Sequence, residues 1–195
     1  LTGSAPDNVR RLVLELRLPR ALTAFGVGGL LAVSGVLMQV LLRNPLAEPY
    51  ILGSSGGAAV AALLAMMFGL GAALVDFAAF GGAMAATVLV FSIAQGSGSW
   101  TPARLLLTGV VLAAGFSAAT TLLLALSPDQ NLRGMLFWLM GDLNYAYAPA
   151  QSLWLLGIIT LLGTVAARHL NVLARGDLQA AIVGLPVAGF RLMVF

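Results

Sequence analysis

The sequence predicts an all-α fold, a polytopic bundle of transmembrane helices. The first observation behind this prediction is composition: the 195 residues are 60% hydrophobic and 9% charged, whereas soluble domains carry about 25% charged residues. The second is that apolar runs of about 20 residues, long enough to cross a bilayer as helices, recur along the chain. Because this number of charged residues cannot cover a water-facing surface, we expect an integral membrane protein.

The first twenty residues are more polar than the rest of the chain. Val9, Leu12, Val13 and Leu16 would share one face of a helix, which favours a helix lying in the membrane interface. A solvated approach to the membrane is an equally good interpretation of the same residues.

Five long apolar segments follow, and we expect each to span the membrane. They cover residues 21–42, 53–74, 76–95, 104–126 and 150–168. Gly69 and Gly71 separate the second from the third so briefly that the two must form a tight hairpin. The stretch 132–143 is apolar and aromatic but too short to span, so we expect it in or near the interface.

Small residues recur at every fourth position in three of these segments, a spacing that lets helix backbones approach closely. The stripes are Ala24, Gly28 and Ala32; Ala78, Gly82 and Ala86; and Gly109, Ala113, Ser117 and Thr121. Bundle packing is the simplest interpretation of most of these residues. The third stripe is the most polar, so it is the best candidate for a face that lines a cavity.

Several classes of chemistry are excluded by what the sequence lacks. With no cysteine and one histidine, His169, it offers neither a thiolate nor a histidine-rich metal site. No acidic or basic residue lies in the middle of a predicted span, as a proton-coupled transporter would require. The chain has no phosphate-binding loop with its lysine and no basic cluster interleaved with aromatics. We therefore expect no metal, no cofactor and no nucleic acid, and any energy for transport must enter through a partner.

One enzyme motif is present, because Gly53-Ser54-Ser55-Gly56-Gly57 fits G-x-S-x-G. With His169 as its base, Ser55 would make the chain an intramembrane serine protease. That motif normally joins a strand to a helix on an α/β sheet, so helix capping and close packing are the simpler interpretation. A structural helical bundle without transport activity is a third possibility.

The turn RNPLAEP (43–49) is the most distinctive connection. Pro45 and Pro49 end helical structure there, and Asn44 and Glu48 can cap the helices around it. Arginine counts on the two sides of the membrane leave the orientation undecided, with five on each side if the spans alternate. They are Arg10, Arg11, Arg17, Arg20 and Arg133 against Arg43, Arg104, Arg168, Arg175 and Arg191.

Residues 16–58, LRLPRALTAFGVGGLLAVSGVLMQVLLRNPLAEPYILGSSGGA, resemble the FecCD family, the permease subunits of type II ATP-binding-cassette importers for iron–siderophore, haem and cobalamin. Three later segments agree in order: RLLLTGVVLAAGFSAATTLLL, LRGMLFWLMGDL and HLNVLARGDLQAAIVGLPVAGFR. Such permeases have about ten helices. The resemblance therefore implies that residues 1–195 are a single transmembrane permease domain from which the first helix and the last three or four are missing.

The resemblance also implies sites. It places residues 1–20 on the periplasmic side and assigns Asn44, Pro45 and Leu46 to a cytoplasmic gate, together with Ser97, Gly98 and Ser99 in the loop 97–100. The stripe Gly109, Ala113, Ser117 and Thr121 would line the pathway shared with a second permease subunit. The coupling helix that contacts the ATPase would include Gly176, Asp177, Leu178, Ala181, Ile182, Gly184 and Leu185. The family pattern matches well at Gly176, Asp177, Ala181 and Gly184 and less well between them.

The function implied is import of an iron(III)–siderophore complex across the bacterial inner membrane, with cobalamin or haem as alternative cargo. The chain would not be an enzyme, because separate ATPase subunits would bind and hydrolyse ATP. Its other partners would be a second permease subunit, identical or different, a periplasmic substrate-binding protein and membrane lipid.

Overall fold

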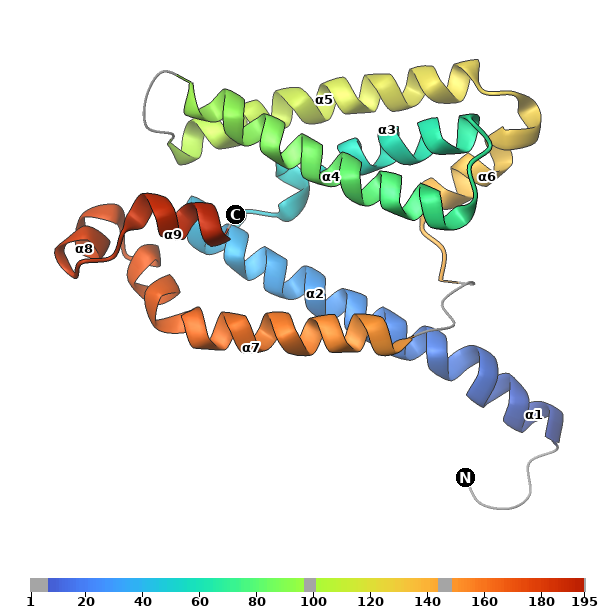
Figure 1. Ribbon diagram of the computed structural model, residues 1–195, viewed down its shortest axis with the longest axis horizontal. Helices are drawn as coiled ribbons and strands as arrows, with labels where there is room; N and C mark the ends of the chain where they lie inside the picture. The colour runs from blue at the N-terminus through green and yellow to red at the C-terminus, as the bar shows by residue number, and fades with distance from the viewer. Residues whose placement is uncertain (1–6, 97–100, 144–148, 195) are drawn as a thin grey trace. The chain divides into compact units, whose positions relative to one another are not determined.

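The computed structural model (Figure 1) describes residues 7–96, 101–143 and 149–194. Within these ranges all regular secondary structure is helical, which confirms the all-α prediction. The chain divides into two compact units. The terminal unit comprises Leu1–Pro45 and Asp142–Phe195, and the central unit comprises Leu46–Gly141. The single permease domain expected over residues 1–195 stays a prediction.

The terminal unit begins with one long helix made of α1 (Asp7–Arg11), a π-helical stretch η1 (Leu12–Arg17) and α2 (Leu18–Leu42). Pro19 has no N–H to donate to Glu15, and its ring would clash with that carbonyl in a regular α-helix. The π-helical stretch precedes Pro19, and the N–H of Leu18 donates to the carbonyl of Val13, five residues back. The residues expected to form a separate interfacial helix are therefore continuous with the first span.

The rest of the terminal unit is α7 (Pro149–Ala174), α8 (Asp177–Ile182) and α9 (Val187–Val194). The long helix packs along α7, and two glycines permit the approach: a Cβ on Gly26 would lie 2.5 Å from Ser152 Oγ, and one on Gly29 would lie 2.6 Å from Leu156 Cδ2. The predicted stripe of Ala24, Gly28 and Ala32 is exposed instead. Small residues occur on more than one face of α2, and within this chain the ones packed against α7 are Gly26 and Gly29.

The central unit consists of η2 (Pro49–Leu52), α3 (Ser54–Met67), α4 (Ala72–Gln95), α5 (Pro102–Leu126) and α6 (Asp129–Met140). Helix α3 packs against α4, α5 and α6, and in Figure 1 α3 runs between α4 and α5. The stripe predicted on α4 does form this contact, because Gly82 and Ala86 both lie against Gly57 of α3. Trp138 of α6 covers the buried cluster of Ala62, Ala65 and Val75.

Four helical segments in the described ranges are long and apolar enough to cross a membrane: Val9–Leu42, Ala72–Gln95, Pro102–Leu126 and Pro149–Ala174. These confirm four of the five predicted spans. The remaining predicted span, the second along the chain, was expected over residues 53–74. It contains α3, which has only 14 residues. Gly69, with φ +68°, ends it: its N–H donates to Met66 and that of Leu70 donates to Ala65, each at 3.0 Å. The tight hairpin between α3 and α4 is as predicted, but the helix before it is shorter.

Candidate functional site

The end of α2 is a Schellman motif, a helix end closed by a left-handed residue and two backbone hydrogen bonds. The N–H of Arg43 donates to Val40 O at 3.4 Å, and the N–H of Asn44 donates to Gln39 O at 3.2 Å. Arg43 has φ +49° and is the one non-glycine residue with positive φ in the described chain. The left-handed conformation costs about 1–2 kcal/mol for a residue with a side chain, so this arginine holds a position that favours glycine.

The side chain of Arg43 reaches Asp177, the first residue of α8, and its Nη2 contacts Asp177 Oδ1. Arg191 of α9 donates from its own Nη2 to the same carboxylate oxygen at 2.6 Å. We call these three residues the Asp177 clamp. The clamp joins the end of α2, the start of α8 and the last turn of α9, all within the terminal unit.

The two arginines differ in their exposure to water. The side chain of Arg191 is 6% exposed, and that of Arg43 is 32% exposed. Burial lowers the pKa of Arg191, the Asp177 carboxylate opposes that shift, and the Arg43 charge adds to the lowering. Because arginine stays charged at physiological pH, the Asp177 carboxylate offsets part of the cost of burying the Arg191 guanidinium.

Helix α8 presents opposite faces to protein and to solvent. Ala180 is fully buried, while Leu178 and Ile182 are each 76% exposed and Ala181 is exposed beside them. Leu185, expected on the same apolar face, lies beyond the helix end and is half-buried. Glycines with positive φ bracket the helix, Gly176 at +124° and Gly184 at +83°. The structure thus has a short helix with an exposed apolar face at the positions predicted for coupling.

The predicted stripe on α5 does not stay on one face. Gly109 is buried and Ala113 half-buried, whereas Ser117 and Thr121 are exposed. A four-residue step on a helix of 3.6 residues per turn advances by about 40°, so Gly109 and Thr121 point about 120° apart. The first part of the stripe packs within the central unit. The exposed part keeps two hydroxyls, and Thr121 Oγ1 donates to Ser117 O at 3.0 Å.

The predicted gate residues are described in part. Asn44 is half-buried, Pro45 is exposed, and Leu46 is 81% exposed. Ser97, Gly98 and Ser99 lie outside the described residues. The gate, pathway and coupling assignments stay predictions.

The G-x-S-x-G motif forms the start of α3. Gly53 has φ +70°, Gly56 lies against Phe116 of α5, and Gly57 lies against α4. Its glycines are therefore accounted for by helix packing, the simpler of the two interpretations. Ser55 is exposed and belongs to the central unit. His169 belongs to the terminal unit, where its ring centroid is 5.6 Å from that of Phe190.

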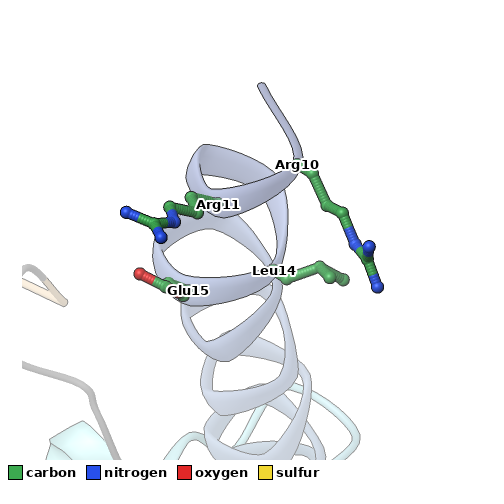
Figure 2. Close-up of a pocket in the computed structure, with 4 residues that line it drawn as sticks. All are labelled: Arg10, Arg11, Leu14 and Glu15. Atoms are coloured by element: carbon green, nitrogen blue, oxygen red, sulfur yellow. The ribbon is translucent and has the colours of Figure 1, made fainter. Parts of the chain in front are cut away.

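A surface hollow near the start of the long helix is lined by Arg10, Arg11, Leu14 and Glu15. All four come from little more than one helical turn, and Figure 2 shows Arg11 and Glu15 together on one side, with Arg10 directed away from them. The hollow contains none of the predicted site residues.

Arg43 and Arg191 were not predicted as site residues. Their sequence distances from Asp177 are 134 and 14 positions, so no local periodicity connects them. The one indication in the sequence is how few charged residues it has. There are ten arginines and seven acidic residues, and three of them meet here.

The chain is similar to known transport proteins. The FecCD transport family matches the chain over residues 1–195. The hemin transport system permease protein HmuU of Yersinia pestis is 40% identical over 97% of this chain and 59% of its own length. The ferric enterobactin permease FepD of Escherichia coli K12 is 39% identical over 93% and 56%. The vitamin B12 permease BtuC of Serratia proteamaculans is 39% identical over 92% and 54%.

A solved structure shows the same architecture. It is an inward-facing conformation of a metal-chelate type ABC transporter, 29% identical, and it superposes with a TM-score of 0.79. The match covers 100% of this chain and 63% of the other. The chain thus spans somewhat more than half the length of the relatives it matches.

Proposed function

Because this chain belongs to the FecCD transport family, we propose that it is part of a permease subunit of an ATP-binding-cassette importer in the bacterial inner membrane. A separate ATPase subunit binds and hydrolyses ATP, a periplasmic protein delivers the solute, and a second permease subunit, identical or different, completes the pathway. The proposed cargo is an iron(III)–siderophore complex.

The exposed apolar face of α8 is the observation that carries this proposal. Leu178 and Ile182 are each 76% exposed on a six-residue helix, which is too short to enter the membrane as a span. Apolar side chains on so short a helix lower the free energy only if something covers them. An ATPase subunit with a groove that receives this short helix is a partner that would cover its apolar face.

The proposed mechanism follows from placing α8 against a moving partner. When ATP binding closes the ATPase subunits, α8 moves with the surface on which it docks. The permease then closes one gate and opens the other. Asn44, Pro45 and Leu46 would belong to the gate on the cytoplasmic side, with Ser97, Gly98 and Ser99. Ser117 and Thr121 would offer weakly polar groups to a bulky solute, consistent with their exposure.

Cobalamin and haem are the alternative cargoes. The relatives named for hemin, enterobactin and vitamin B12 are 39–40% identical to this chain, so identity does not choose among them. Uptake of labelled ferric siderophore, hemin and cobalamin by proteoliposomes containing the whole importer would decide the cargo.

Disulfide cross-linking tests the coupling role. The sequence contains no cysteine, so a single cysteine at Ala181 is placed in a cysteine-free full-length permease and paired with cysteines along the groove of the ATPase. Ala180→Cys is the matched control, because Ala180 is fully buried on the opposite face and Ala181 is exposed. We expect cross-links at 181 that change with ATP, and none at 180.

Two results would count against the proposal. Absence of a cross-link from position 181 to every groove position, with both proteins folded in the membrane, would remove the coupling role. Labelling of Ser55 by a fluorophosphonate probe, lost in Ser55→Ala, would instead favour the protease.

A further inference from the structure

The Asp177 clamp has a feature that helix capping alone does not explain. Three described helices end in the same backbone pattern, with a left-handed residue and paired hydrogen bonds: α2 at Arg43, α3 at Gly69 and α8 at Gly184. Glycine occupies this position in two of them, as steric cost favours. An arginine kept where glycine would be unstrained indicates that its side chain has a use.

The partner of that side chain lies at the start of the predicted coupling helix. Arg43 contacts Asp177, and a Cβ built on Gly176 would lie 3.7 Å from Arg43 Nη1. The guanidinium therefore lies near Gly176, the glycine that precedes α8, as well as the Asp177 carboxylate. On its other side Arg43 is fixed to α2 by two backbone hydrogen bonds, and Asn44 and Pro45 follow it directly.

We propose that Arg43 and Asp177 are positioning residues that tie α8 to the end of α2, so that a displacement of α8 is transmitted to the turn at Asn44 and Pro45. This inference rests on the proposed function. Arg191, almost completely buried, holds Asp177 from α9 and fixes the direction in which the carboxylate faces Arg43.

Arg43→Gln is the variant that isolates this link. It removes the Arg43 charge but neither partner of the Asp177–Arg191 pair, and the side chain it changes is partly exposed, so we expect the variant to fold. Asp177→Asn would alter the contacts of Arg43 and Arg191 at the same time, because both arginines contact the same carboxylate oxygen, so it is not the primary test. Arg43→Lys keeps the charge and should retain most of the response.

The measurement uses the full-length permease, free of cysteine, in complex with its ATPase. A single cysteine replaces Glu48, an exposed residue of the turn 43–49, and its rate of reaction with a maleimide is measured with and without ATP. In Arg43→Gln we expect ATP hydrolysis to change less than twofold, while the ATP-dependent change in labelling rate falls about tenfold, in the range of coupling between sites. Transport per ATP hydrolysed should fall with it.

Arg175→Gln is the matched control. It removes the same charge from an exposed side chain immediately before Gly176, and it should leave both readouts unchanged. If Arg43→Gln retains the parent's ATP-dependent labelling, or if Arg175→Gln loses it equally, the inference is wrong while the proposed function stands. If the parent itself shows no ATP-dependent labelling and no association with the ATPase, the proposed function fails.

Discussion

Two helix pairs, α3 with α4 and α2 with α7, are both held together through glycines, but what the glycines touch differs. In the first pair the contact is reciprocal and involves backbone: a Cβ on Gly57 would lie 2.5 Å from Gly82 O, and one on Gly82 would lie 2.4 Å from Gly57 O. In the second pair the nearest neighbours of Gly26 and Gly29 are side-chain atoms of Ser152 and Leu156.

This difference predicts how each pair tolerates a methyl group. A carbonyl oxygen of a helix backbone can move only if the helix moves, whereas a leucine side chain can adopt another rotamer. Replacing glycine by alanine also favours the helical state by up to about 1 kcal/mol. The measured change in the free energy of unfolding is therefore the difference between this gain in helix propensity and the cost of the steric clash.

The largest effect is expected for Gly57→Ala. The new methyl group would meet Gly82 O and the Cβ of Ala86 at 2.5 Å each, so α3 and α4 must separate. We expect a loss of about 3 kcal/mol, at the upper end of overpacking costs, measured by thermal unfolding of the full-length permease in detergent. Gly81→Ala, where nothing lies within 4 Å, is the control and should not destabilise. Equal stability of the two variants would refute the backbone contact.

An intermediate effect is expected for Gly26→Ala. Its Cβ would meet Ser152 Oγ at 2.5 Å and Cβ at 2.8 Å, with the carbonyl carbon of Ser152 at 3.0 Å. The serine can turn away only by giving up its hydrogen bond to Pro149 O. A loss of about 2 kcal/mol in the same unfolding measurement would place this contact between the other two. A loss as large as that of Gly57→Ala would mean that α7 cannot shift.

The smallest effect is expected for Gly29→Ala. All three nearest atoms belong to the end of the Leu156 side chain, so a rotamer change relieves the clash. We expect a loss of about 1 kcal/mol or less after the gain in helix propensity. Gly28→Ala, on the neighbouring open position, should be neutral or slightly stabilising. If Gly28→Ala destabilised more than Gly29→Ala, the packed face of α2 would be the predicted stripe after all.

Apolar composition was enough to predict an all-helical membrane protein and four of its spans, because helices and closed barrels are the only structures that satisfy backbone groups in lipid. Gly69 and Gly71 marked the hairpin after α3, but the apolar run continues past them, so the bounds 53–74 drawn from composition extend beyond the helix end at Gly69. Nor could composition choose between Gly28 and Gly26 as the packed position of α2, because both are small residues and only the partner helix distinguishes them.

The candidate site was predictable to a similar degree. The exposed face of α8 follows from local sequence, and Leu178 and Ile182 lie where the resemblance implied. The clamp depends on two contacts distant in the sequence, and a count of charges does not reveal which of them meet. The polar stripe of α5 was read at a spacing of four, which rotates around a helix, so its two ends lie on different faces.

The length of α3 has a consequence for solvent. Fourteen residues make a helix about 21 Å long, against a hydrocarbon core of about 30 Å. If α3 begins or ends at one membrane surface, roughly 9 Å of the hydrocarbon thickness must be crossed by residues outside the helix. Backbone at that depth is stable only where protein surrounds it or water reaches it. Residues next to α3 at that depth are therefore expected to contact protein or water rather than lipid.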